Sequence, residues 1–171
     1  MKIVLACEGK TEVCLIKDLI ERGIFSFNSE IIYEEPLVLR QLDKIKPLIV
    51  TLPLDEDILV FRIGDTLTDE MSLKGLEIRM EHIRIYKICT KPEIEILVII
   101  QEGFWTEYNN SEFCGDPKQF LKSKKFSFDP NTYFLQNGMI DSIVKYKKYK
   151  KHKKEEYYLA DLIDWCNKGI Y

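Results

Sequence analysis

The sequence predicts an α/β protein with a mostly parallel sheet flanked by helices. Short apolar runs suited to buried strands alternate along the chain with segments whose apolar residues recur at helical spacing. A polar turn follows several of these runs directly. The 171 residues, of which 46% are hydrophobic and 31% charged, can bury one core without a disulfide or metal. These values exclude collagen-like, low-complexity and wholly disordered proteins.

The first strand is expected at residues 3–7, an apolar run typical of a strand that is buried on both faces. Residues 8–10 form the turn after it. Thr11 is then the expected N-cap of a helix that ends at Gly23. The apolar residues of this helix recur at helical spacing: Val13, Ile16, Leu19 and Ile20. The chain therefore opens with a strand, a tight polar turn and a helix.

Three further strands are expected, at residues 31–33, 57–63 and 82–88. Between the first two, a helix that Pro47 starts or kinks is indicated by apolar residues spaced three and four apart: Leu42, Ile45, Ile49 and Leu52. After the last of them, Pro92 occupies the position of a helix's first residue. The helix it opens, residues 94–102, is apolar almost all round and is expected to be buried.

The region from residue 109 to 137 shows weak periodicity and several turn signals, so we expect an irregular excursion there. Two helices should follow, one from about Met139 and one from about Glu155 that ends at Gly169. Their apolar residues are Ile140, Ile143 and Val144 in the first, and Leu159, Leu162, Ile163 and Cys166 in the second. Residues 1–108 would thus form the α/β core, and residues 109–171 would pack on it within one domain.

Charge is distributed unevenly along the chain. Residues 1–116 carry a net charge of −9, whereas residues 117–171 carry +6, which suggests that the two regions have different tasks. The apolar stretch at the N-terminus is too short for a signal peptide and no apolar run approaches the length of a membrane span, so we expect a cytoplasmic protein without a membrane partner. Five cysteines without a CxxC pair favour neither a disulfide framework nor a zinc site.

Carboxylates follow two of the expected strands. Glu8 comes directly after the first strand, and Asp65 comes after the strand at 57–63. Parallel strands bring such residues to one edge of the sheet, where carboxylate oxygens can hold Mg²⁺ (or Mn²⁺). Asp69 lies close enough in sequence to join them, and Glu95 is a further candidate because a carboxylate in a buried helix is costly unless it is paired or bound to metal.

These carboxylates also have structural interpretations that the sequence leaves open. A glutamate before a helix interacts favourably with the helix dipole, and Gly-Asp after a strand is a common turn. Glu95 could equally be a charge that stabilises the N-terminus of its helix, or a partner of Arg62 or Arg84.

A basic run near the C-terminus is the second feature that suggests function. Lysines neutralise phosphates and tyrosine rings stack on unpaired bases, so the run could bind nucleic acid. A solvated helix face is the structural alternative. The candidate contact residues are Lys145, Tyr146, Lys147, Lys148, Tyr149, Lys150, Lys151, Lys153 and Lys154.

Residues 2–12, with the turn Glu8-Gly9-Lys10-Thr11-Glu12, resemble the opening of Toprim domains, the Rossmann-like fold shared by topoisomerases, primases and OLD-type nucleases. Residues 58–66 are similar to the strand that delivers the metal-binding aspartates of that family. Within it, the small RloB-like proteins of restriction and phage-defence loci are most similar, through residues 92–97 and the Lys- and Tyr-rich segment 145–158. The resemblance implies a Toprim-like parallel sheet with a basic, helical C-terminal extension.

The same resemblance implies roles for single residues. Glu8 would be the general acid/base or a metal-supporting carboxylate, and Asp65 a Mg²⁺ ligand. The family pattern is Asp-x-Asp, whereas this sequence has Leu67 in place of the second aspartate. Asp69 could substitute only if the turn bends back.

Three hypotheses follow. The first is a nuclease-like protein that hydrolyses DNA or RNA phosphodiesters with Mg²⁺ in phage defence or restriction. The second is a degenerate, non-enzymatic Toprim-like subunit that binds nucleic acid or a partner such as an ATPase, which Leu67 favours. The third is a small-molecule phosphoesterase or nucleotidyl transferase that uses the same carboxylates.

Overall fold

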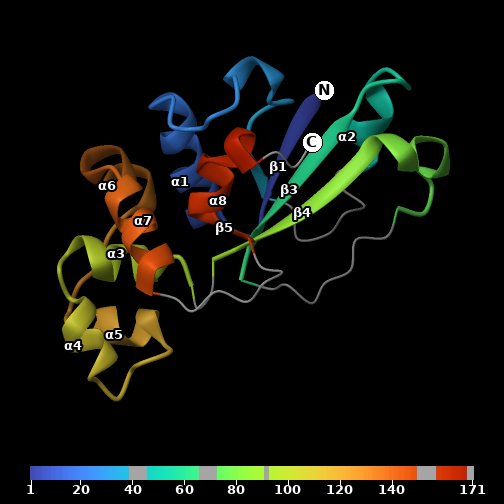
Figure 1. Cartoon of the computed structure of the whole chain (residues 1–171). Coiled ribbons are helices and arrows are strands. Elements are labelled where there is room, and N and C mark those ends of the chain that lie inside the picture. Colours follow the sequence, from blue (N-terminus) through green and yellow to red (C-terminus); the bar gives the residue numbers. More distant parts are fainter. Residues whose placement is uncertain (39–45, 66–72, 91–92, 150–156, 169–171) are drawn as a thin grey trace.

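The computed structural model describes residues 1–38, 46–65, 73–90, 93–149 and 157–168. These residues contain a five-stranded sheet in the order β2-β1-β3-β4-β5, in which every neighbouring pair is parallel (Figure 1). Helices flank the sheet, so the predicted α/β class is confirmed. The strands are β1 (Lys2–Cys7), β2 (Leu37–Val38), β3 (Ile58–Gly64), β4 (Ile83–Cys89) and β5 (Tyr157–Tyr158).

The helices vary in length from five to twelve residues. The α-helices are α1 (Lys10–Glu21), α2 (Lys46–Thr51), α3 (Glu95–Gln101), α4 (Trp105–Asn109), α5 (Pro117–Ser123), α6 (Pro130–Asn137), α7 (Ile140–Tyr149) and α8 (Leu159–Ile163). Three 3₁₀ segments are η1 (Ser29–Ile31), η3 (Glu77–His82) and η4 (Trp165–Lys168). No helix among these residues is long and apolar enough to cross a membrane.

The three central strands end at the same level. Cys7 of β1 is in register with Ile63 of β3, and Ile63 is in register with Ile88 of β4. The residues that follow these strands therefore leave the sheet at one edge, which we call the carboxyl edge.

The main core lies on one face of the sheet. Alternate residues of β1 and β3, such as Leu5 and Phe61, pack there against α1, α3, α7 and α8. Phe120 of α5 and Trp165 of η4 belong to the same apolar cluster, so residues 1–108 and 109–171 share one core. On the other face, a smaller cluster around Val60 is covered in the described residues by α2, Leu76 and their neighbours.

Two expectations for the first part of the chain were wrong. Residues 31–33 are not a strand, because residues 29–31 form η1 and Ile32 makes only one bridge, to Ile3. The second strand is instead the two-residue β2. Thr11 is not an N-cap either, since Gly9 precedes the first residue of α1 and makes no side-chain cap. The end of α1 is as predicted, because Gly23 follows its C-cap with a φ of 63°.

The predicted irregular excursion at 109–137 was also wrong, because it contains α5 and α6. Each of these helices begins with a proline after an aspartate whose side chain caps it, Asp116 for α5 and Asp129 for α6. Near the C-terminus, residues 157–158 pair with β4 as β5, so the last helix begins at Leu159 rather than near Glu155. Pro92, the expected first residue of one helix, and Gly169, the expected end of the last helix, lie outside the described residues.

Candidate functional site at the carboxyl edge of the sheet

Glu8 and Asp65 meet at the carboxyl edge, as the positions after their strands predict. The backbone N–H of Asp65 donates to Oε2 of Glu8 at 3.0 Å. The backbone N–H of Glu8 itself donates to the carbonyl of Ile63 at 2.9 Å. The Glu8 side chain is therefore held across the end of β3, beside the Asp65 backbone.

Gly64 leaves room for this arrangement. A Cβ atom added to Gly64 would lie 2.8 Å from Cβ of Glu8 and would also meet the Glu8 carboxylate. Because the Glu8 backbone is bound to β3, its Cβ cannot move away easily. The glycine before Asp65 is therefore required by the close approach of Glu8 rather than by its φ angle.

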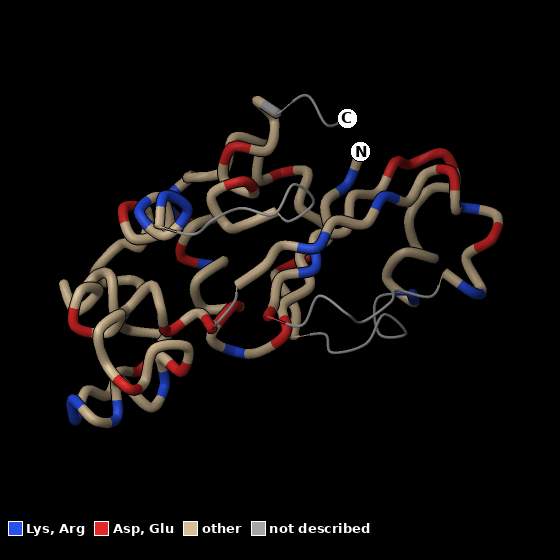
Figure 2. The backbone as a smooth tube through the Cα atoms, turned by 60° about the horizontal axis from the view of Figure 1, so that its bottom comes forward, with Lys and Arg blue, Asp and Glu red and all other residues tan. Residues whose placement is uncertain are grey.

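Two more carboxylates lie near this pair. Glu12 is in the first turn of α1, and burial raises its pKa, to which the negative charges of Glu95 and Glu8 add. Burial also raises the pKa of Glu95, to which the charges of Glu93 and Asp65 add, while Lys118 acts in the opposite direction. We call Glu8, Glu12, Asp65 and Glu95 the carboxylate cluster. Figure 2 shows acidic segments close together near the middle of the view, with a basic segment between them.

Lys118 is the cation nearest to Glu95 among the ion pairs of the described residues. Its Nζ lies 2.8 Å from Oε1 of Glu93 and 3.8 Å from Oε1 of Glu95. Within the residues that the structure describes, the ion-pair partner of Glu95 is Lys118 rather than Arg62 or Arg84. The other carboxylate oxygen of Glu93, Oε2, is buried without a hydrogen-bond partner among the described residues.

The sequence interpretation did not single out Glu12, Glu93 or Lys118 as site residues. Glu12 was part of the turn motif that we compared with Toprim domains, but its position in the first turn of α1 is what points it to the other carboxylates. Lys118 was placed in the irregular excursion. The sequence Asp116-Pro117, a signal for a helix start, would have located it in the first turn of α5.

The chemistry of these side chains fits Mg²⁺. Mg²⁺ takes oxygen ligands and is usually bound through one or two carboxylates, with water and substrate phosphate as its remaining ligands. Half-buried carboxylates that repel one another would gain from a bound cation. Across the described residues, however, no three His, Cys, Asp or Glu side chains are arranged to hold a metal ion by themselves. Asp69 and Leu67 lie outside those residues, so the metal role expected for Asp69 stays a prediction.

The residues of the basic run differ in exposure and pairing. Lys145, Lys148 and Tyr149 are exposed on α7. By contrast, Tyr146 is buried, and Lys147 pairs with the buried Asp161 at 2.6 Å. The fold therefore uses Tyr146 and Lys147 for packing and pairing, and the buried Tyr146 ring is not available to stack on a base. The remaining candidates, Lys150, Lys151, Lys153 and Lys154, lie outside the described residues.

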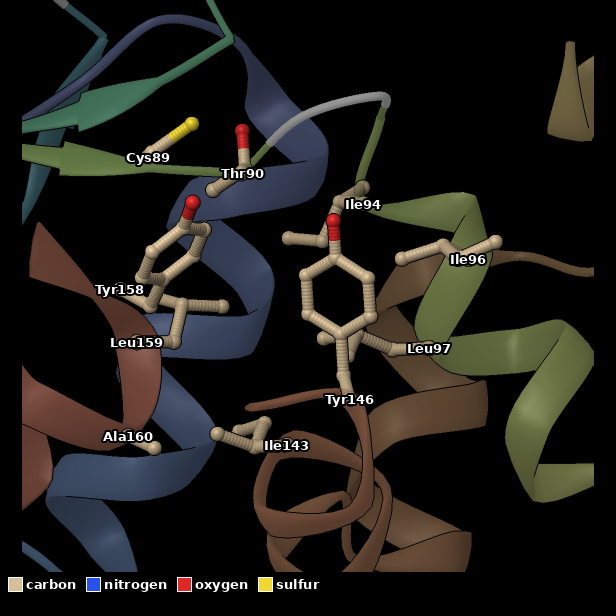
Figure 3. Close-up of a pocket in the computed structure, with 10 residues that line it drawn as sticks. All are labelled: Cys89, Thr90, Ile94, Ile96, Leu97, Ile143, Tyr146, Tyr158, Leu159 and Ala160. Atoms are coloured by element: carbon tan, nitrogen blue, oxygen red, sulfur yellow. The ribbon is translucent and has the colours of Figure 1, made fainter. Parts of the chain in front are cut away.

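Tyr146 lines a small cavity that also receives Tyr158 and Thr90 (Figure 3). The hydroxyl oxygen of Thr90 is buried and has no hydrogen-bond partner among the described residues. The other walls are mostly apolar: Cys89, Ile94, Ile96, Leu97, Ile143, Leu159 and Ala160. The space inside is about 10 Å³, which is enough for one water molecule at most. It is therefore too small to be a substrate pocket.

Comparisons of the chain with protein-family models, with curated proteins and with solved structures find no match.

Proposed function

We propose that this protein hydrolyses phosphodiester bonds of DNA or RNA with the help of Mg²⁺ (or Mn²⁺), as its resemblance to Toprim-type and RloB-like proteins implies. The observation that supports this most is the carboxylate cluster: Glu8 meets Asp65 at the carboxyl edge of a parallel sheet, where α/β proteins bind their ligands. Glu12 of α1 and Glu95 of α3 complete the carboxylate cluster. The raised pKa values of Glu12 and Glu95 mark it as an unusual environment for four carboxylates.

Each side chain has a role in this proposal. Asp65 and Glu95 would hold the ion, and Asp69, which lies outside the described residues, remains a predicted third ligand. Bound there, Mg²⁺ would polarise the phosphate and lower the pKa of an attacking water molecule. Glu8, which the Asp65 backbone N–H keeps in place, would accept the proton of the water that attacks the phosphodiester. Lys118 supplies positive charge near Glu95 for the substrate phosphate.

The substrate is held by the exposed part of the basic run, in which Lys145 and Lys148 remain accessible. Both lysines are part of the region 117–171, which carries a net charge of +6. A role in phage defence or restriction, with a partner such as an ATPase, and a cytoplasmic location belong to the same proposal. They rest on the resemblance and on the sequence alone.

A cleavage assay with Glu8→Gln tests the proposal. Labelled DNA and RNA oligonucleotides are incubated with Mg²⁺ and the wild type or the variant, and products are separated on a gel. We expect the rate to fall roughly 10²- to 10⁴-fold, as for other proton-transfer residues, while circular dichroism stays unchanged. Glu21→Gln, at the exposed far end of α1, is the matched control and should cleave normally. Equal rates for Glu8→Gln and wild type would remove Glu8 from the mechanism.

One observation favours a second function, that of a non-catalytic nucleic-acid-binding or partner-binding subunit. Within the described residues no ready-made metal site of three side chains is present, and Leu67 replaces an aspartate of the family pattern. A subunit of this kind would bind oligonucleotides with a steep salt dependence but would not cleave them. Multiple-turnover cleavage that depends on Asp65 would exclude this alternative.

A further inference from the structure

Two aromatic rings are stacked on the surface where α4 begins and α7 ends. The rings of Trp105 and Tyr149 are nearly parallel, with an interplanar angle of 9° and centroids 4.6 Å apart. Trp105 is half-buried and packs against the main core, whereas the Tyr149 side chain is 47% exposed. The core thus fixes one ring from below, and the other ring remains accessible to solvent.

Two exposed lysines precede the outer ring on α7. Lys145 lies one helical turn before Tyr149 and Lys148 directly before it, and both are exposed. Neither of them forms an ion pair with another described residue. Two acidic side chains near the stack are paired with other lysines: Asp161 with Lys147, and Glu107 of α4 with Lys124. Asp141, one helical turn before Lys145, is exposed.

The stack also lies toward the carboxylate cluster. Helix α7 runs past α3 in the opposite direction, since Ser142 Oγ donates to Gln101 at the C-terminal end of α3, whereas Tyr146 lies beside Ile94 near its N-terminal end (Figure 3). Tyr149 is almost one turn beyond Tyr146. It therefore occupies the end of α7 that is nearest to Glu95.

We propose that Trp105 and Tyr149 form a stacking platform for an unpaired base of single-stranded nucleic acid, with Lys145 and Lys148 contacting the adjacent phosphates. The proposal rests on the proposed function and narrows it to single-stranded substrates. A base offers its flat face to a tyrosine only when it is unstacked from its neighbours, and lysines beside the ring neutralise the backbone without selecting a sequence. A duplex has its base faces covered and would gain only the lysine contacts.

The two tryptophans allow a direct test. Trp165 is fully buried, so quenching of fluorescence by a bound base would come from Trp105. A short oligothymidylate is titrated into the full chain in the presence of EDTA, which separates binding from cleavage, and its affinity is measured in parallel by fluorescence anisotropy of a labelled strand. We expect quenching on binding, and an affinity for the single strand well above that for a duplex of equal length.

Single substitutions test which residues contribute to binding of the single strand. Tyr149→Ala should weaken binding of the single strand by roughly 5- to 100-fold, the usual range for loss of one stacked base, whereas Tyr149→Phe, which keeps the ring, should bind like the wild type. Lys148→Ala should reduce both the affinity and its salt dependence. Lys74→Ala is the charge-matched control, because this exposed lysine precedes η3. Figure 1 shows the segment of residues 77–82 on the opposite side of the molecule from α7.

Several results would overturn the platform. These are unchanged affinity of a folded Tyr149→Ala variant, binding of the single strand without quenching, duplex binding as tight as single-strand binding, and no binding of any oligonucleotide. The cleavage assay with Glu8→Gln is read separately. If the wild type cleaves but Tyr149→Ala binds the single strand as tightly as the wild type, the platform alone is disproved. If Tyr149→Ala weakens single-strand binding but the wild type does not cleave, the hydrolytic function alone is disproved.

Discussion

The carboxyl edge of the sheet and helix α7 hold the two groups of residues that the sequence singles out, and the fold treats them in opposite ways. At the carboxyl edge, side chains of like charge are brought together from β1, α1, β3 and α3, and burial with mutual repulsion raises the pKa of Glu12 and Glu95. On α7, the charges that point inward are satisfied, as in the pair between Lys147 and Asp161.

The carboxylate cluster and the basic run therefore differ in how strongly they indicate a function. Half-buried carboxylates that repel one another oppose the stability of the fold, and groups perturbed in this way concentrate at functional sites. A satisfied pair needs no ligand to explain it. The carboxylate cluster is therefore the stronger indication of function, and within the basic run only the exposed residues keep a functional interpretation.

Gly64→Ala should cause the largest loss of stability. The added methyl group would be 2.8 Å from Cβ of Glu8, whose backbone is bound to Ile63, so we expect the free energy of unfolding to fall by about 1–3 kcal/mol. Urea denaturation measures this. Gly9→Ala is the matched control, since its methyl group would meet only the flexible end of Glu12. An equal effect of both substitutions would show that Glu8 is not held tightly at this edge.

Lys147→Ala should cause the second largest loss of stability. It leaves the carboxylate of Asp161 buried without its cation, which we expect to lower the free energy of unfolding by about 2 kcal/mol, between the values for exposed and fully buried pairs. Lys148→Ala, one residue along the same helix, should change it by less than about 0.5 kcal/mol because Lys148 is exposed. Similar losses in both variants would contradict the division of the basic run into structural and exposed residues.

Glu12→Gln should cause the smallest change in stability, and the size of this change should depend on pH. Because the folded state raises the pKa of Glu12, the folded protein binds more protons than the unfolded chain, and stability declines as the pH rises through the folded pKa. The variant should therefore be more stable than the wild type at pH 7, and this difference should vanish below about pH 4. Thermal unfolding at both pH values measures it.

Glu35→Gln serves as the control for this effect, because Lys17 lowers the pKa of Glu35 and removal of the carboxylate should not stabilise the protein. A Glu12→Gln variant that is less stable than the wild type at pH 7 would mean that burial and repulsion do not destabilise the charged form of Glu12 in the folded protein.

The sequence predicts the central part of the molecule well for a physical reason. Strands β1 and β3 are almost entirely buried, and their continuous apolar runs are visible without any knowledge of the fold. Strand β4 is only partly buried and was predicted from its alternation of apolar and polar residues. Since parallel strands end at one edge, the meeting of Glu8 and Asp65 could be predicted from their positions alone.

The edges of the sheet and the short helices could not be predicted in this way. Strands β2 and β5 contain two residues each, too few for any pattern, and their place is decided by pairing with β1 and β4. Helices α5 and α6 are too short for clear periodicity, and their Asp-Pro starts resemble turns. The contact of Lys118 with Glu93 and Glu95 depends on α5, so it was missed together with that helix.

Calorimetric titration of Mg²⁺ into the wild type and into Asp65→Ala tests most directly whether the carboxyl edge is a metal site. Circular dichroism would verify that the variant remains folded. We predict that the wild type binds Mg²⁺ and that the folded variant binds it at least about tenfold more weakly. Equal affinities in the two proteins, or no binding in either, would contradict the account.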